Sequence, residues 1–190
     1  AISFVGSSDI AHYVYSTGTA HGKRVQAFGG AKNHGIVLPD ADLAQTVKDL
    51  AGAAFGSAGE RCMALPVVVP VGKTTAEELK KRMIDEIGTL RVGVSTDPDA
   101  HYGPVVTAIH KARVTDWINT AEKEGSEVVV DGRGFKLQGH ENGYFLGPTL
   151  LDRVTTDMSS YKEEIFGPVL QIVRAETFEE ALSWPSKHAY

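Results

Sequence analysis

Short apolar runs alternate along this chain with segments of helical periodicity, and this alternation restricts the possible folds more than any other feature. The runs have the length and the β-branched or aromatic content of strands. They are residues 2–7, 25–28, 36–38, 67–71, 90–94, 128–130, 144–146, 149–151 and 169–173. Strands that alternate with helices indicate an α/β fold with a mainly parallel sheet flanked by helices.

Five segments are predicted to be helical from their start and stop signals. They start at Ser8 or Asp9, at Asp40 or Asp42, at the capping boxes Thr74-x-x-Glu77 and Thr75-x-x-Glu78, at about Thr107, and at Thr177. Glycines end or weaken three of them, at Gly22, Gly56 and Gly125. In the fourth segment, the spacing predicts an inward stripe of Ile109, Ala112, Trp117 and Ala121.

Composition excludes several classes of function. The chain has 190 residues, enough for one large domain or slightly more, and its net charge is -5. There is no basic stripe of the kind that nucleic acids require. No apolar run reaches the roughly 18 residues of a membrane span, so no membrane partner is expected. A single cysteine and the absence of a leader point to a reducing compartment, either cytoplasmic or the mitochondrial matrix.

That cysteine, Cys62, lies in the segment Gly59-Glu60-Arg61-Cys62-Met63-Ala64. It cannot form an intramolecular disulfide, and a free cysteine is often only a small buried hydrophobe. Two neighbours favour a reactive thiol instead. The positive charge of Arg61 would favour the thiolate, and Gly59 lets the backbone approach a ligand closely. Cys62 is therefore a candidate nucleophile.

Other motifs are less specific. Gly29-Gly30 follows a strand but lacks the spacing of a phosphate-binding loop. None of the seven histidines has a metal-ligand spacing, so each is interpreted as a surface or capping residue and no metal is expected. The segment 163–168 reads as a helix-to-strand junction, or as a site where Glu164 accepts hydrogen bonds from sugar hydroxyls.

Four segments taken in order, residues 4–7, 29–30, 59–64 and 163–168, resemble the aldehyde dehydrogenase superfamily. Residues 103–105 and 143–149 are similar to its spacer motifs. Residues 30–34 and 61–64 resemble most closely the CoA-acylating branch, which acts on malonate and methylmalonate semialdehydes. The resemblance runs from end to end and implies an aldehyde-dehydrogenase-like catalytic domain.

The resemblance also implies an organisation. Residues 1–28 would be the last strand-helix-strand unit of the NAD-binding domain, and residues 29–190 a catalytic domain incomplete at its C-terminus. The chain would be truncated at both ends, and alone it would be inactive because most of the cofactor domain is absent. A full-length form would be a homo-oligomer. Two other readings stay open: a non-catalytic truncated or proteolytic fragment, and a cysteine acyltransferase or hydrolase independent of NAD.

Roles for individual residues follow from the resemblance. Ser7 would contact the NAD pyrophosphate at a helix N-terminus, and Phe28 would pack near the nicotinamide. Glu164 would bind a ribose, with Phe166 a neighbour of the same group. Cys62 would attack the aldehyde carbon, and its own backbone N–H would be one oxyanion donor.

Two further positions bear on the reaction. Hydrolytic members of the superfamily have Glu-Leu-Gly-Gly-Lys where this chain has Ala27-Phe28-Gly29-Gly30-Ala31. Ala27 has no proton acceptor to activate water, which fits transfer of the acyl group to CoA, a thiol that needs less help. Arg61 would bind the carboxylate of the semialdehyde, its other roles being thiolate stabilisation or a surface salt bridge. The products would be acetyl-CoA or propionyl-CoA.

Overall fold

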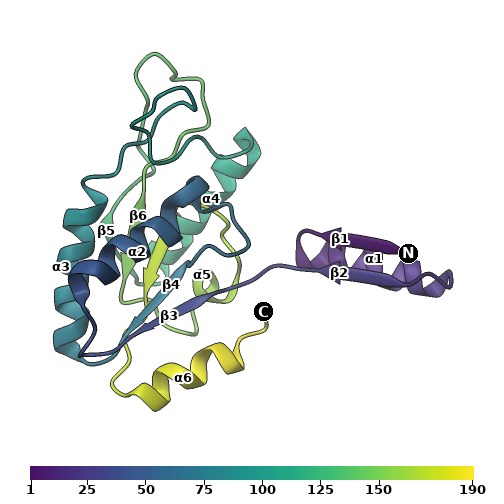
Figure 1. Cartoon of the computed structure of the whole chain (residues 1–190), viewed down its shortest axis with the longest axis horizontal. Helices are drawn as coiled ribbons and strands as arrows, with labels where there is room; N and C mark the ends of the chain where they lie inside the picture. Colours follow the sequence, from purple (N-terminus) through teal and green to yellow (C-terminus); the bar gives the residue numbers. More distant parts are fainter. The chain divides into compact units, whose positions relative to one another are not determined.

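The chain separates into two units in the computed structural model, which describes all 190 residues. One unit comprises residues 1–31 together with Tyr190, and the other comprises residues 32–189. The division falls slightly later than the boundary after residue 28 that the sequence predicts. Figure 1 labels the helices and strands of both units. No helix in either unit combines the length and the apolar character needed to cross a membrane.

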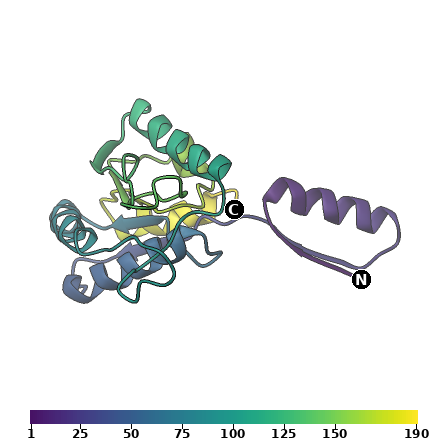
Figure 2. The ribbon, with the colours of Figure 1, turned by 90° about the horizontal axis from the view of Figure 1, so that it is seen from above.

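The first unit is a parallel strand pair with one helix. Strand β1 (Ile2–Val5) pairs with β2 (Val25–Phe28), and α1 (Ser8–Ala20) connects them. Figure 2 shows α1 lying along one face of the pair. The N-cap of α1 is Ser7 rather than the predicted Ser8 or Asp9, whereas Gly22 ends the turn after the helix as predicted, with φ +68°.

A five-stranded sheet organises the second unit. Its order is β3-β4-β7-β6-β5, and every neighbouring pair is parallel except β5 with β6. The strands are β3 (His34–Val37), β4 (Val67–Pro70), β5 (Glu127–Val130), β6 (Thr149–Asp152) and β7 (Val169–Ile172). The prediction of a mainly parallel sheet is confirmed.

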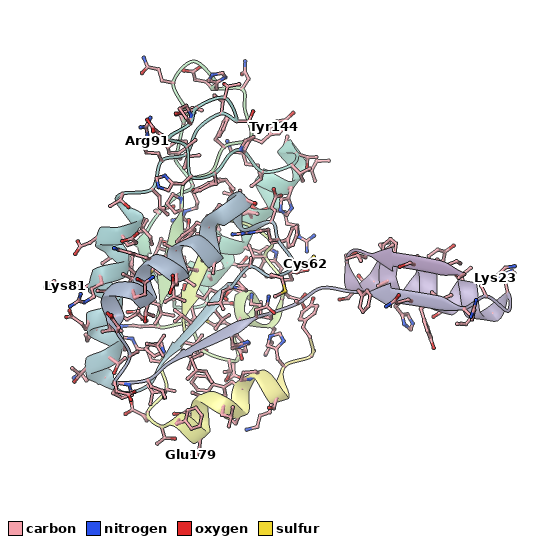
Figure 3. The ribbon with its side chains drawn as sticks, in the orientation of Figure 1. Lys23, Cys62, Lys81, Arg91, Tyr144 and Glu179 are labelled. Carbon is pink, nitrogen blue, oxygen red and sulfur yellow. The ribbon has the colours of Figure 1, made fainter.

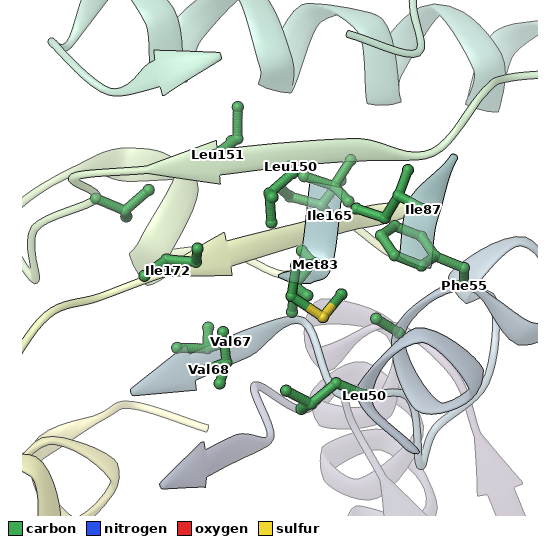
Figure 4. Packing of buried hydrophobic residues seen from close by; sticks show 14 of the residues in the cluster. Leu50, Phe55, Val67, Val68, Met83, Ile87, Leu150, Leu151, Ile165 and Ile172 are labelled. Carbon is green, nitrogen blue, oxygen red and sulfur yellow. The ribbon is translucent and has the colours of Figure 1, made fainter. Parts of the chain in front are cut away.

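Helices cover the sheet of the second unit. They are α2 (Leu43–Phe55), the short 3₁₀ turn η1 (Gly56–Gly59), α3 (Lys73–Ile87), α4 (Ala108–Lys123), α5 (Ser159–Lys162) and α6 (Phe178–Lys187). Helices α2 and α3 lie on one side of the sheet and α4 lies on the other (Figure 2). Figure 4 shows how Phe55, Met83 and Ile87 from α2 and α3 pack with Val67 and Leu150 from the strands, all of them buried.

The predicted helix starts are confirmed at three positions, where the side chain of the N-cap residue accepts hydrogen bonds from amides of the first helical turn. Asp42 accepts hydrogen bonds from the amides of Ala44 and Gln45, and the hydroxyls of Thr107 and Thr177 cap α4 and α6. The capping boxes at Thr74 and Thr75 are wrong, because α3 begins at Lys73 and its N-cap is Gly72, two residues before Thr74. Gly72 adopts φ +84°, which an L-residue rarely does, so the turn before α3 depends on it.

Two strand predictions are wrong, and the predicted inward face of α4 is only partly right. Residues 90–94 form only an isolated bridge between Val92 and Tyr102, and residues 144–146 lie in a loop. The predicted inward stripe of α4 is right for Ala121, which is buried, and for Trp117, which packs against the core. It is wrong for Ala112, which is exposed, and for Ile109, which is 84% exposed, and it omits the buried Val114 and Ile118. The apolar residues at the start of α4 therefore do not face the sheet, because the packing direction is set by the later turns of the helix.

A fully buried carboxylate, Asp152, ends β6. Its Oδ1 atom accepts a hydrogen bond from Nε of Arg174 at 2.9 Å, and its Oδ2 atom lies 3.2 Å from Nζ of Lys80. Burial acts to raise the pKa of Asp152, but the hydrogen bonds from Arg174, the Arg153 amide and Lys80 outweigh it and lower the pKa. The ion pair therefore joins β6 to α3 and to the residues after β7.

Candidate active site

The chain enters the cysteine segment through a left-handed turn. Helix α2 ends at Phe55 with Gly56 as its C-cap, and then Ser57, Ala58 and Gly59 adopt φ values of +54°, +56° and +70°. Left-handed backbone costs a non-glycine residue roughly 1–2 kcal/mol, so the surrounding packing must hold this turn. Ala58 and Gly59 are buried, which supplies that packing. The turn leaves residues 61–63 on the surface.

Cys62 is exposed, so the interpretation of this residue as a small buried hydrophobe is wrong. It lies at the surface of the second unit in Figure 3. Its amide has no backbone hydrogen-bond partner, and its carbonyl oxygen accepts a hydrogen bond from Nδ2 of Asn33 at 2.9 Å. Asn33 Nδ2 also donates to the carbonyl oxygen of Ala64 at 2.7 Å. The main chain on both sides of Met63 is thus anchored while the thiol faces outward.

Arg61 turns back onto the end of α2. Its Nη2 atom donates to the carbonyl oxygen of Gly52 at 2.7 Å, and a Cβ added at Gly56 would lie 2.0 Å from the same nitrogen. A cation at the last turn of a helix is favoured by the carbonyls that point there. Arg61 forms no ion pair, so the surface salt bridge considered for it is wrong.

The segment that carries Glu164 and Phe166 lies against the turn before Cys62. A Cβ added at Gly59 would lie 2.1 Å from the carbonyl oxygen of Gly167, so only glycine allows this approach. Phe166 itself adopts φ +55°. The fold thus joins two of the segments singled out in the sequence, although about a hundred residues separate them.

His110 bridges the same two segments. Its Nε2 atom lies 2.6 Å from the Phe166 carbonyl oxygen and 3.3 Å from Oε1 of Glu60. Burial raises the pKa of Glu60, although the Val106 amide and His110 act in the opposite direction. His110 is mostly buried, so its interpretation as a surface or capping residue is wrong. No local pattern could have identified it, because its partners lie far away in the sequence.

Lys32 is a buried lysine that holds the chain just before Glu164. Its Nζ atom donates to the carbonyl oxygens of Ser160 at 2.7 Å and Glu163 at 2.6 Å. Burial lowers the pKa of Lys32 to about 7, although Glu164 and Glu163 act to raise it. Glu164 is half-buried. Sequence analysis placed Lys32 and Asn33 in a segment of resemblance but assigned neither a role.

In the first unit, Ser7 and Phe28 lie at the same end of the strand pair, because the amide of Gly6 donates to the Phe28 carbonyl oxygen at 3.1 Å. The side chain of Ser7 makes no capping hydrogen bond with the first turn of α1. Phe28 is 53% exposed. Each of the two units thus carries some of the predicted site residues, with Ser7 and Phe28 in one and Cys62, Arg61, Glu164 and Phe166 in the other.

The profile of the aldehyde dehydrogenase family matches residues 1–190, the whole chain. The chain belongs to the aldehyde dehydrogenase family. It is 53% identical over 190 residues to the malonate-semialdehyde dehydrogenase of Pseudomonas aeruginosa, covering 100% of this chain and 38% of that protein. It is 46% identical to the human mitochondrial methylmalonate-semialdehyde/malonate-semialdehyde dehydrogenase [acylating], covering 100% of this chain and 35% of that protein.

The crystal structure of another relative matches the fold of this chain over its whole length. The Sinorhizobium meliloti 1021 protein, complexed with NAD, superposes with a TM-score of 0.98 and is 55% identical, covering 100% of this chain and 39% of that one. The chain therefore has the α/β fold of the aldehyde dehydrogenase family, as expected. It spans less than two fifths of the length of these relatives.

Proposed function

We propose that this chain supplies the nucleophile of an NAD-dependent, CoA-acylating dehydrogenase that oxidises malonate or methylmalonate semialdehyde. The observation that carries the proposal is Cys62, an exposed thiol at the end of a strained and well-anchored turn. The identities of 46–53% to semialdehyde dehydrogenases support the substrate class.

The first step needs a thiolate and a place for negative charge. The Cys62 sulfur adds to the aldehyde carbon and forms a carbon–sulfur bond, and the carbonyl oxygen becomes an oxyanion. The amide N–H of Cys62 has no backbone acceptor, so it is available to donate to that oxygen. The Arg61 carbonyl, which shares a peptide group with this amide, accepts a hydrogen bond from the Ala64 amide at 2.9 Å, and this bond restricts the orientation of the Cys62 N–H. Asn33 anchors the next peptide group through the carbonyl of Cys62.

Each of the two units has residues that fit one part of a dinucleotide. The N-terminus of α1 at Ser7 presents helix amides without a side-chain cap, which favours a pyrophosphate, and the exposed ring of Phe28 offers an apolar surface for a nicotinamide. The half-buried carboxylate of Glu164 would accept hydrogen bonds from ribose hydroxyls, beside Phe166. Bound NAD would supply the acceptor for the hydride that leaves the substrate carbon.

The acyl group then remains on Cys62 as a thioester. Neither Ala27 nor Phe28, at the end of β2, carries a proton acceptor that could activate water, and general-base help is typically worth roughly 100- to 10,000-fold. A CoA thiolate needs no such base to attack the thioester. With loss of the substrate carboxylate as carbon dioxide, the product is acetyl-CoA or propionyl-CoA, and the Cys62 thiol is regenerated.

Arg61 is the proposed partner of the substrate carboxylate. It is exposed, adjacent to Cys62, and uses Nη2 to bind the Gly52 carbonyl. A guanidinium has five N–H donors, so this one bond leaves the others for a carboxylate. The Gly52 carbonyl would restrict the rotamers of a long side chain and hold the guanidinium beside the nucleophile.

The test is product formation by the full-length protein with malonate and methylmalonate semialdehydes, NAD and CoA. We expect NADH and acyl-CoA in equal amounts, little turnover without CoA, and no turnover from the Cys62→Ala variant. NAD binding by that variant, followed by fluorescence, serves as the control for folding. NADH formation that survives in Cys62→Ala would refute the role of this thiol, and a free acid as the main product would refute acylation of CoA.

A further inference from the structure

Two adjacent residues at the entrance to β3, Lys32 and Asn33, reach in different directions to two separate loops. Lys32 donates to the carbonyl oxygens of Ser160 and Glu163, at 2.7 Å and 2.6 Å. Asn33 donates to the carbonyl oxygens of Cys62 and Ala64, at 2.9 Å and 2.7 Å. Each side chain therefore bonds to two main-chain carbonyls of one loop.

The hydrogen bonds of Lys32 are buried and specific, unlike a surface ion pair. The residue is only 6% exposed, and both of its acceptors are neutral main-chain carbonyls. A buried ammonium group loses its hydration, so it is retained only where hydrogen bonds replace the lost water. Its acceptors lie at the start of α5 and immediately before Glu164. The side chain thus fixes the position of the main chain immediately before Glu164.

The Asn33 contact is equally specific. An asparagine amide has two N–H donors, and here Nδ2 serves the two carbonyls on either side of Met63. Met63 is 87% exposed, so packing of its side chain does not hold this loop. The hydrogen bonds from Asn33 are then a principal restraint on the main chain of Cys62, together with the turn at 57–59.

We infer that Lys32 and Asn33 are positioning residues with separate tasks, Lys32 orienting the Glu164 loop for the dinucleotide ribose and Asn33 orienting the Cys62 loop for acylation. The inference rests on the proposed function for what each loop binds. Strand β3 pairs with β4 from His34 onward, so Lys32 and Asn33 extend from the first paired residue of the sheet to both loops. Neither side chain contacts the reacting atoms.

The test compares Lys32→Met and Asn33→Leu in the full-length protein, with Lys81→Met and Asn142→Leu as matched controls on the surface. Each test variant keeps a side chain of similar length and loses the donors. Lys32→Met is expected to raise the KM for NAD about tenfold and to change kcat little. Asn33→Leu is expected to lower kcat about tenfold and to leave the KM for NAD nearly unchanged. The controls should match the wild type.

Amide hydrogen exchange gives a second readout that does not require dehydrogenase activity. Faster exchange is expected in residues 160–167 of Lys32→Met and in residues 60–64 of Asn33→Leu, with each variant leaving the other loop protected. If the two variants show this pattern of exchange while the wild type forms no NADH, the proposed function fails and the positioning roles stand.

Equal effects of both variants on KM and kcat, or exchange that rises in both loops together, would overturn the division of tasks and indicate a common structural role. Unchanged exchange in both variants would overturn the inference entirely. If Lys32→Met does not fold, Lys32→Gln keeps an uncharged amide with two N–H donors on a shorter side chain. It should show the same selective rise in the KM for NAD, at smaller size.

Discussion

The main chain of Gly59 and the carbonyl group of Gly167 are in direct contact, close enough that a Cβ at residue 59 would lie 2.1 Å from the Gly167 oxygen. Gly59 also has φ +70°. The close approach requires glycine at this position and the left-handed backbone favours it. The approach explains how the loop of Cys62 and the loop of Glu164 meet. The contact holds two parts of the proposed site against each other without any side chain.

Gly59→Ala should therefore destabilise the protein. The added methyl group collides with main-chain atoms that cannot move away cheaply, and the left-handed backbone adds strain, so we expect a loss of at least about 2 kcal/mol in the free energy of unfolding. Gly52→Ala is the matched control, because it lies in α2 with nothing within 4 Å of the added Cβ. The free energy of unfolding of Gly52→Ala should be about 0.5–1 kcal/mol higher than that of the wild type. Denaturant unfolding measures both, and equal effects would refute the steric argument.

On the proposed mechanism, Ala27→Glu should allow water to hydrolyse the Cys62 thioester, so that turnover no longer depends on CoA. If residue 27 takes the place of the glutamate of hydrolytic family members, as proposed, its carboxylate would activate water, and we expect CoA-independent turnover to rise at least about tenfold. Phe28→Glu is the comparison variant, since adjacent residues of a strand face opposite sides. Product analysis by mass spectrometry distinguishes free acid from acyl-CoA. A rise in Phe28→Glu alone would assign the position of the missing base to residue 28.

Arg61→Leu should reduce kcat/KM far more for semialdehydes that carry a carboxylate than for propanal. Loss of a charge-assisted hydrogen bond to a carboxylate corresponds to about 1.5–3 kcal/mol, or roughly 10- to 150-fold. Arg82→Leu, which removes only an exposed ion pair with Glu78, should leave both substrates unaffected. Equal losses on the two kinds of substrate would instead assign Arg61 to the support of the loop through Gly52.

Lys32 should make stability rise with pH above neutrality. Its pKa is about 7 in the folded protein, against 10.5 ordinarily, so between these values the unfolded chain binds more protons than the folded one. The groups that face it are Glu163, Glu164 and His34. The cost of burying its charge is fully present below pH 7 and is relieved as the pH rises toward 10.5. The difference in unfolding free energy between wild type and Lys32→Met should increase from pH 7 to 9.5, with Lys81→Met showing no such trend.

Asp152 should contribute to stability in the opposite pH range. Its folded pKa lies below the ordinary 3.8, so its contribution is fully present above about pH 5 and is lost as the pH falls through the folded value. Asp152→Asn leaves the charges of Arg174 and Lys80 without their buried partner, which should cost roughly 3 kcal/mol at pH 7. On acidification, the free energy of unfolding of the variant should then fall by less than that of the wild type. Parallel acid-unfolding curves would contradict this.

Some features of the fold could be predicted because their causes are local. Asp42, Thr107 and Thr177 cap helices through amides two or three residues away, and such signals are visible in the sequence. Thr74 and Thr75 carried an equally good signal and were overridden, since the Gly72 amide donates to the Ala175 carbonyl oxygen and so ties the start of α3 to the residues after β7.

The sequence indicated the candidate site residues themselves. It indicated few of the residues that hold their loops in place. Cys62 was recognisable as the single cysteine among glycines, and its exposure agrees with a reactive thiol. His110 was assigned to the surface because its partner Phe166 is 56 residues away. Lys32 had no pattern that would connect it with Ser160, at a separation of 128 residues.

By itself, the sequence determined the alternation of strands and helices and several helix caps, and it singled out Cys62 as the proposed nucleophile. These depend on hydrogen bonds and side-chain periodicity within a few residues. Only the tertiary structure decided that the turn at 57–59 is left-handed, that Gly59 meets Gly167, and that Lys32 and Asn33 hold two different loops. The physical reason is that buried carbonyls must find donors wherever the folded chain places them, and that placement is a property of the whole sheet.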